Sequence, residues 1–211
     1  MVTPPIARVT QTLGTVEKMS TAQTANVLLL DQSDSTSQAI GRGDARPKLV
    51  GIQEAVTIFI SSLPTSAHLS IIAFHSKAEV LWPMQAIGHS KLDIIKRVQE
   101  MISHGTTDMA GSLLLAEQEF SKVGSGFILR AYNLSDGIPN EDPSAQAERL
   151  RNSGVQLHCI GFGDPNCQEI DEMLLRNMAS QSASGTILYY HFVEARQLTG
   201  FLKRESKTLT Q

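Results

Sequence analysis

The sequence predicts a single α/β domain with a mostly parallel central sheet and helices on both of its faces. Short apolar stretches typical of strands alternate with longer segments in which apolar residues recur at three- and four-residue steps. This alternation is typical of βαβ units, in which each crossover helix covers one face of the sheet. The length of 211 residues fits one such domain better than two.

The first predicted strand covers 25–30, a short apolar run that stops at Asp31, as expected of a strand buried on both faces. A polar loop is predicted over 31–47. The next segment, 49–63, has helical spacing and ends before Pro64, with its apolar positions at Leu49, Ile52, Val56, Phe59, Ile60 and Leu63.

Two strands are predicted over 68–74 and 79–82, joined by a short polar turn as a hairpin at one edge of the sheet. Helices are predicted over 91–102 and 109–120 from their apolar spacing. A strand over 127–134 follows, although it contains Arg130 and Asn133, which are unusually polar for a central parallel strand.

Asp142 before Pro143 favours a helix start, and Gly154 favours the end of that helix. A strand over 155–161 comes next. The remaining expected elements are a helix around Ile170–Met178, a strand over 187–192 and a closing helix over 193–203.

We expect the domain to occupy 25–203, with 1–24 as an N-terminal extension and 204–211 as a C-terminal tail. The formal net charge of -3, without a Lys/Arg run, argues against nucleic-acid binding. No apolar run approaches the roughly 20 residues of a membrane span, and the first twenty residues lack a signal-peptide hydrophobic region. We therefore expect a cytoplasmic protein without a membrane partner, whose oligomeric state the sequence leaves open.

The two cysteines, Cys159 and Cys167, lack a usual zinc-ligand spacing and are expected to be a core thiol and a loop thiol.

Oxygen-bearing side chains follow three of the predicted elements. Asp31, Ser33 and Ser35 alternate after the first strand, Thr107 precedes a helix, and Asp136 ends a strand. Functional groups of an open α/β sheet gather at the carboxyl ends of its strands, so we expect these oxygens to lie together. Hard cations such as Mg²⁺ prefer such ligands. Taken alone, Asp-x-Ser-x-Ser is also a common helix cap.

Together these segments resemble the metal-ion-dependent adhesion site of the von Willebrand factor A family, which has Asp-x-Ser-x-Ser, a Thr in a Gly-rich loop, and Asp-Gly. The resemblance runs from about Ala25 to about Leu202 and includes Ile160-Gly161-Phe162-Gly163, which is similar to the end of the family's fifth strand. It implies a Rossmann-like, doubly wound fold with about six strands, one of them an antiparallel edge strand.

The resemblance also implies a site for Mg²⁺, with Mn²⁺ or Ca²⁺ as alternatives. Ser33, Ser35 and Thr107 would offer hydroxyl oxygens, while Asp31 and Asp136 would bind through water or directly. An Asp or Glu of a protein partner would complete the octahedron, so the implied function is non-enzymatic protein binding. By analogy, stand-alone domains of this family work beside AAA+ ATPases or in bacterial stress and metal-resistance systems.

The sequence departs from the family pattern at Asp34, where Gly is frequent, at Thr106, where a second Gly is common, and at Thr36, which replaces a frequent Met. Asp34 and Asp108 add negative charge that favours a cation and repels an acidic partner.

Two alternatives stay open. A metal-dependent hydrolase or phosphotransfer enzyme would use the same oxygens and need a base, for which His104, Asp34 and Asp108 are the candidates. Otherwise the cluster is structural, and its side chains bind one another without metal. A dinucleotide loop over 161–166 lacks the third glycine, and a Gly-x-Ser-x-Gly elbow is absent from the sequence.

Overall fold

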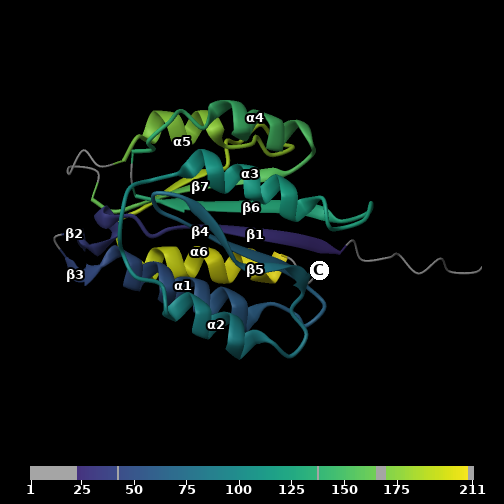
Figure 1. Cartoon of the computed structure of the whole chain (residues 1–211), viewed down its shortest axis with the longest axis horizontal. Coiled ribbons are helices and arrows are strands. Elements are labelled where there is room, and N and C mark those ends of the chain that lie inside the picture. The colour runs from purple at the N-terminus through teal and green to yellow at the C-terminus, as the bar shows by residue number, and fades with distance from the viewer. Residues whose placement is uncertain (1–22, 42, 137, 165–169, 209–211) are drawn as a thin grey trace, which may run out of the picture.

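The computed structural model describes residues 23–41, 43–136, 138–164 and 170–208. A six-stranded sheet lies between two layers of helices (Figure 1), with the strand order β5-β4-β1-β6-β7-β8. Its strands are β1 (Thr24–Asp31), β4 (His68–Phe74), β5 (Ala78–Ala86), β6 (Ile128–Ser135), β7 (Gln156–Phe162) and β8 (Tyr189–Phe192). The helices are α1 (Lys48–Ser62), α2 (Lys91–Gln99), α3 (Met109–Phe120), α4 (Ser144–Asn152), α5 (Glu172–Met178) and α6 (Ala195–Thr208).

The sheet has the predicted mixture of directions. Strands β4 and β5 pair antiparallel at one edge, and every other neighbouring pair is parallel. Helices α1, α2 and α6 cover one face, and α3, α4 and α5 cover the other. The α/β fold predicted from the sequence is therefore confirmed. Since the crossovers after β1 and β6 lie on opposite faces, the chain reverses its winding between these two central strands, where such folds place their binding sites.

Strand β1 is buried on both faces, as its apolar run predicts. Leu28 and Leu30 belong to the core under α1 and α6, whereas Val27 and Leu29 belong to the core under α3. All four side chains are fully buried. Asp31, the last residue of this strand, therefore lies at the carboxyl end of a buried central strand.

The segment predicted as a loop over 31–47 contains regular structure. It forms the 3-10 helix η1 (Asp34–Ser37) and a hairpin of β2 (Ala39–Gly41) with β3 (Asp44–Pro47). Ile40 of the hairpin is fully buried and packs over Gly51 of α1, where an added Cβ would lie 2.9 Å from the Ile40 Cδ1 atom. The hairpin is thus anchored to α1 beside the carboxyl ends of the strands.

Several predicted boundaries shift by a few residues. Strand β5 is longer than the predicted 79–82, α2 ends at Gln99, and α6 continues to Thr208. Pro143 lies at the N-cap of α4 and not at its first helical position, although Gly154 ends that helix at φ 88° as expected.

The two polar residues of β6 are accommodated in different ways. Arg130 lies near the start of the strand, where it donates hydrogen bonds to Gln156 and Thr208. Asn133 is fully buried, and its amide lies 3.5 Å from the Met109 sulfur.

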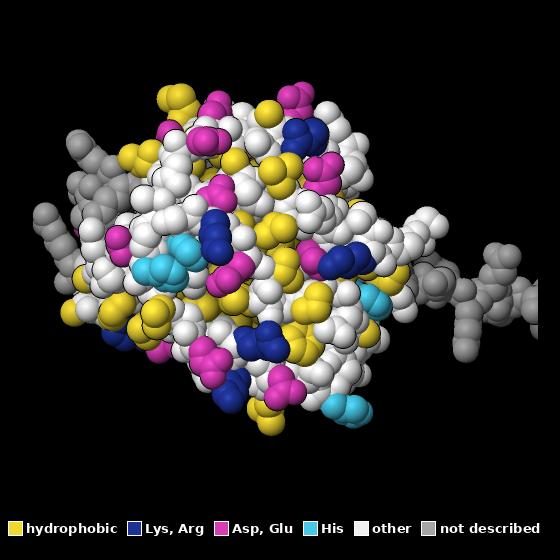
Figure 2. Space-filling model, viewed as in Figure 1, with side chains coloured by type: hydrophobic (Ala, Val, Ile, Leu, Met, Phe, Trp, Pro, Cys, Tyr) yellow, Lys and Arg dark blue, Asp and Glu magenta, His cyan; other side chains and the backbone are white. Residues whose placement is uncertain are grey.

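Charged side chains of both signs are interspersed over the face shown in Figure 2. No helix in the described part of the chain is long and apolar enough to cross a membrane. Cys159 is buried, and burial raises the pKa of its thiol to about 12, in keeping with the expected core thiol. Cys167 lies outside the described residues.

Candidate metal site

Two carboxyl groups lie side by side at the carboxyl ends of β1 and β6. Asp31 is the last residue of β1 and Asp136 follows β6, and both side chains are fully buried. The Ser33 amide donates a hydrogen bond to Asp31 Oδ1 (2.9 Å), and the Ser135 hydroxyl donates one to Asp31 Oδ2 (2.6 Å). The Asp31 carboxylate is therefore fixed from both sides.

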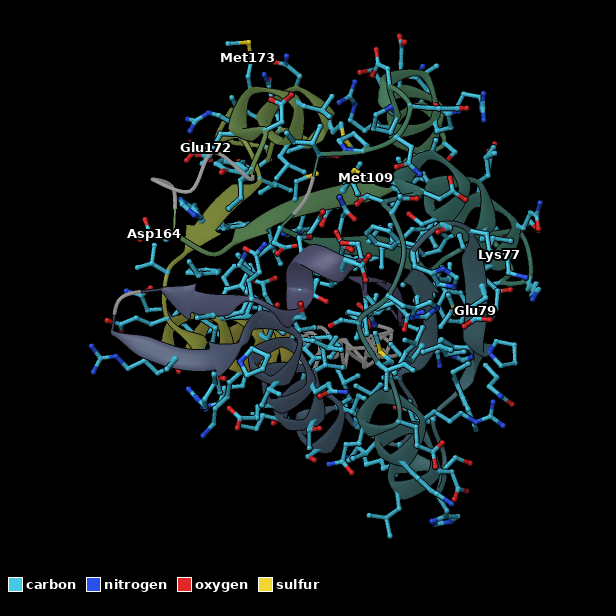
Figure 3. All side chains as sticks on the ribbon, turned by 60° about the vertical axis from the view of Figure 1, so that its left-hand side comes forward. Lys77, Glu79, Met109, Asp164, Glu172 and Met173 are labelled. Carbon is cyan, nitrogen blue, oxygen red and sulfur yellow. The ribbon has the colours of Figure 1, made fainter. Side chains whose placement is uncertain are left out.

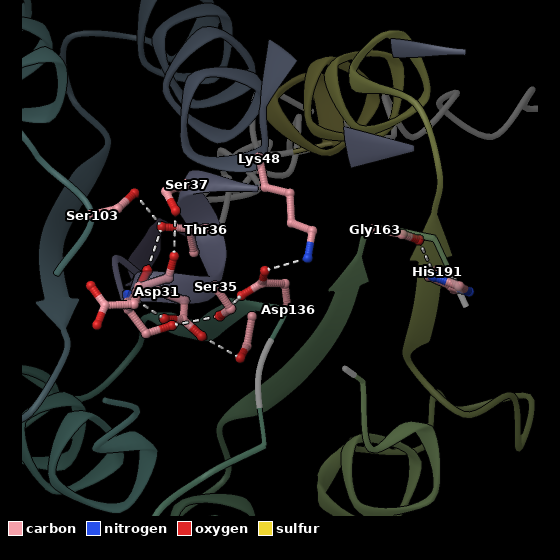
Figure 4. Close-up of polar contacts among 12 residues, drawn as sticks. Asp31, Ser35, Thr36, Ser37, Lys48, Ser103, Asp136, Gly163 and His191 are labelled. Atoms are coloured by element: carbon pink, nitrogen blue, oxygen red, sulfur yellow. Dashed lines mark hydrogen bonds and ion pairs between the residues drawn. The ribbon is translucent and has the colours of Figure 1, made fainter. Parts of the chain in front are cut away.

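The serine hydroxyls link the first loop to the end of β6. Ser33 Oγ lies 3.0 Å from Ser35 Oγ, and Ser35 Oγ donates to Asp136 Oδ1 at 2.9 Å (Figure 4). Alternate residues of the loop thus face a common point, as the Asp-x-Ser-x-Ser spacing predicts. The Ser33 backbone amide connects them to Asp31, so one hydrogen-bonded chain joins the two loops.

The loop that carries Thr107 is tied to the first loop through the backbone. His104 N donates to Gln32 O (2.8 Å), and Asp34 N donates to Gly105 O (2.9 Å). Gly105 has φ 73°, and a Cβ there would lie 2.4 Å from the Ser76 hydroxyl, so the loop requires glycine at this position. These contacts bring the Thr107 loop to the same edge of the sheet, with the Thr107 side chain buried.

Asn140 closes the arrangement from the loop after β6. Its side-chain oxygen accepts from Thr107 N (3.2 Å), its backbone amide donates to Thr107 O (3.0 Å), and its side-chain amide donates to Thr106 Oγ1 (2.9 Å). Asn140 was not predicted, because a single Asn in a polar loop has no distinguishing spacing. The three predicted loops are therefore joined pairwise, with Asp164 and Glu172 on one side of this edge and Lys77 and Glu79 on the other (Figure 3).

Lys48, the first residue of α1, is a second unpredicted member of the cluster. Its side chain is only 3% exposed, and Nζ lies 2.8 Å from Asp136 Oδ2. A Cβ on Gly163 would lie 3.0 Å from Lys48 Cε, so that glycine leaves room for the lysine stem. Cations are disfavoured at helix N-termini, and this was the one sequence signal that could have singled Lys48 out.

Burial and, after it, the negative charge of Asp136 raise the pKa of Asp31 to about 6. The two carboxyl groups therefore repel one another, and a divalent cation beside them would relieve that repulsion. Within the described residues, no three His, Cys, Asp or Glu side chains are grouped as metal ligands, so a cation here would rely on Ser and Thr hydroxyls. Neutral hydroxyls beside carboxylates fit a hard cation such as Mg²⁺.

The three residues that depart from the family pattern are placed as follows. Thr36 is buried and donates to Ser33 O at 2.8 Å, which stabilises η1. Asp34 and Thr106 are exposed.

The side chain of Asp108 accepts hydrogen bonds from two backbone amides. Its Oδ1 accepts from Gly111 N (2.9 Å) and its Oδ2 from Ala78 N (3.1 Å), so this carboxylate caps α3. The His104 ring lies 3.9 Å from the His75 ring, and its Nδ1 is 2.9 Å from Ile102 O.

Comparison with known proteins agrees with this architecture. The chain matches the von Willebrand factor type A domain over residues 27–204. It is 25% identical over 159 residues to Matrilin-1 of Mus musculus, which covers 67% of this chain and 31% of that protein.

Solved structures share the fold. A von Willebrand factor type A protein from Catenulispora acidiphila superposes with a TM-score of 0.72 at 21% identity, over 89% of this chain and 43% of the other. Proximal thread matrix protein 1 from the mussel byssus, solved with a zinc-occupied MIDAS motif, gives 0.70 at 19% identity, over 90% and 48%. This chain thus spans less than half of each of these relatives. From the match over most of its length, the chain belongs to the von Willebrand factor type A domain family.

Proposed function

We propose that this domain is a non-enzymatic binding module that holds Mg²⁺ through Asp31, Ser33, Ser35, Thr107 and Asp136 and captures an Asp or Glu of a protein partner. The observation that carries the proposal is the continuous chain Asp31–Ser33–Ser35–Asp136 at the carboxyl edge of the sheet. The zinc-occupied MIDAS motif of the mussel byssus protein supports a metal at this position of the fold.

The hydrogen bonds of these residues indicate the role of each in the proposed site. Asp31 orients the first loop through Ser33 N, and Asp136 orients the Ser35 hydroxyl. Ser33, Ser35 and Thr107 then offer neutral oxygens. The bound metal would supply positive charge next to an open coordination position, which a carboxylate from outside satisfies better than a neutral group does.

The surroundings of the three candidate catalytic bases support a binding role over an enzymatic one. Asp108 accepts two backbone hydrogen bonds, Asp34 is exposed, and the His104 ring is tilted against the His75 ring. An activated water needs a base within hydrogen-bond reach, or one water away. Of the three candidates, Asp108 is already engaged as a helix cap, which supports binding over turnover.

The test is titration of Mn²⁺-loaded protein with acetate and, as a neutral control of the same shape, acetamide. A carboxylate that enters the coordination sphere displaces water, so acetate should lower the paramagnetic enhancement of water-proton relaxation and acetamide should not. The Thr107→Ala variant provides the background expected from weakly held metal. Equal effects of acetate and acetamide would contradict carboxylate capture.

A further inference from the structure

Lys48 is a buried cation inside a site that is proposed to bind a cation. The ammonium lies 2.8 Å from Asp136 Oδ2, and the two side chains are 3% and 0% exposed. Burying an ammonium is costly unless it is well paired, and here Asp136 supplies the pair.

The backbone of Lys48 is fixed by a hydrogen bond, and Gly163 leaves room for the end of its side chain. Its backbone amide donates to Gln38 O at 2.9 Å, which fixes the start of α1 against the first loop. Gly163 leaves no side chain beside Cε and Nζ. The ammonium and the Ser35 hydroxyl bind different oxygens of Asp136 (Figure 4), so both can hold this carboxylate at the same time.

The charges of the fully buried groups set what the site can bind. Asp31 and Asp136 carry two negative charges when ionised, and Lys48 leaves a single net negative charge. A divalent cation would then give the loaded cluster one net positive charge. Without Lys48 the loaded cluster would be neutral. Asp34, which is exposed, and Asp164, which is half-buried, also lie at this edge. Both are unchanged when Lys48 is replaced, so they do not alter the difference in charge that Lys48 makes.

We propose that Lys48 sets the charge of this site: its ammonium holds Asp136 when no metal is present, weakens metal binding, and leaves the loaded site positive enough to attract a carboxylate. This inference rests on the proposed function. Lys48 is then a positioning residue. Its removal should strengthen metal binding and weaken carboxylate binding, and a purely structural ion pair would not produce these opposite effects.

The first experiment compares Lys48→Met with the unchanged chain by calorimetric titration of Mn²⁺ into metal-stripped protein. The variant should bind Mn²⁺ more tightly, on the order of tenfold or more, because a like charge next to the carboxylate of Asp136 is removed. Lys96→Met is the matched control, since it removes an equal charge from an exposed pair with Glu100. Equal or weaker Mn²⁺ binding by Lys48→Met would overturn the inference.

Thermal unfolding tests the role of Lys48 without a measurement of binding constants. In EDTA, Lys48→Met should have a lower Tm than the unchanged chain, because two buried carboxylates lose their cation. Added Mg²⁺ should raise the Tm of the variant more than that of the unchanged chain. If Lys48→Met fails to fold in EDTA, the double variant Lys48→Met with Asp136→Asn should fold there and show no Mg²⁺ response. Failure of the double variant to fold in EDTA would show that Lys48 does not offset the charge of Asp136, and would overturn the inference.

The acetate titration separates this inference from the proposed function. Mn²⁺-saturated Lys48→Met should bind acetate more weakly than the unchanged chain, again on the order of tenfold. If the two proteins bind Mn²⁺ equally and both take up acetate, the role of Lys48 is wrong and the proposed function stands. If Lys48→Met binds Mn²⁺ more tightly but neither protein takes up acetate, the effect of Lys48 on the metal is supported and carboxylate capture is overturned. Absence of Mn²⁺ binding in both overturns both.

Discussion

Replacement of His158 by phenylalanine should remove a pH-dependent loss of stability. His158 lies within β7, is 5% exposed, and stacks on Tyr132 with ring centroids 4.7 Å apart. Neither ring nitrogen has a hydrogen-bond partner within the described residues. Burial therefore lowers the pKa of His158 from 6.5 to about 4.

The sign and size of the effect follow from this difference in pKa. The unfolded chain takes up a proton at His158 near pH 6.5, whereas the folded chain resists protonation down to about pH 4. The contribution of His158 to stability is thus fully present above pH 6.5 and is lost as the pH falls toward 4. At about pH 5 the loss amounts to about 2 kcal/mol of unfolding free energy.

Urea unfolding of both proteins at about pH 7.5 and about pH 5 measures this loss. Other groups titrate equally in both, so the difference between the proteins isolates His158. That difference should change by about 2 kcal/mol in favour of His158→Phe at the lower pH. The exposed His89 is the control, and His89→Phe should leave the pH dependence unchanged. A constant difference between His158→Phe and the unchanged chain would refute the reasoning.

Three further substitutions test the loops. Ser135→Ala removes a 2.6 Å hydrogen bond to the buried Asp31, so urea unfolding in EDTA should show a loss of about 1.5 to 3 kcal/mol, and an unchanged stability would contradict the assignment. Asn140→Ala removes the side-chain hydrogen bonds that hold the Thr107 loop. Calorimetry should show Mn²⁺ affinity reduced a few-fold, and an unchanged affinity would show that these hydrogen bonds are dispensable. Gly111→Ala places a Cβ 2.2 Å from Asp108 Oδ2, which should displace that helix cap at a cost of about 1 kcal/mol in thermal unfolding, so a stabilised variant would argue against the cap.

The fold could be predicted where local patterns are long. Strand β4 and helix α3 have the predicted bounds, because a mostly apolar run and a complete helical period each identify their element. The β2–β3 hairpin could not be predicted, since its strands have three and four residues and bury mainly Ile40. Strands this short show no periodicity, and their pairing depends on packing against α1.

Some residues of the candidate site could also be predicted from the sequence, and others could not. Asp31, Ser33 and Ser35 were recognisable because their alternate spacing in a strand-to-helix loop is unusual. Lys48 and Asn140 were not, since each acquires its role only through partners far away in the sequence. Lys48 follows a proline at a helix start, where a lysine would ordinarily be a solvated surface residue.

The most direct test of the central claim is calorimetric titration of Mn²⁺ into the metal-stripped chain beside Ser35→Ala, Thr107→Ala and Ser37→Ala. Ser37 lies two residues from Ser35, is exposed, and donates its hydroxyl to Asp34 O, so it is the matched control. We expect saturable binding of one Mn²⁺ per chain, retained in Ser37→Ala and strongly weakened in the other two variants. Binding of equal strength in all four proteins would place the cation elsewhere and contradict the assigned site.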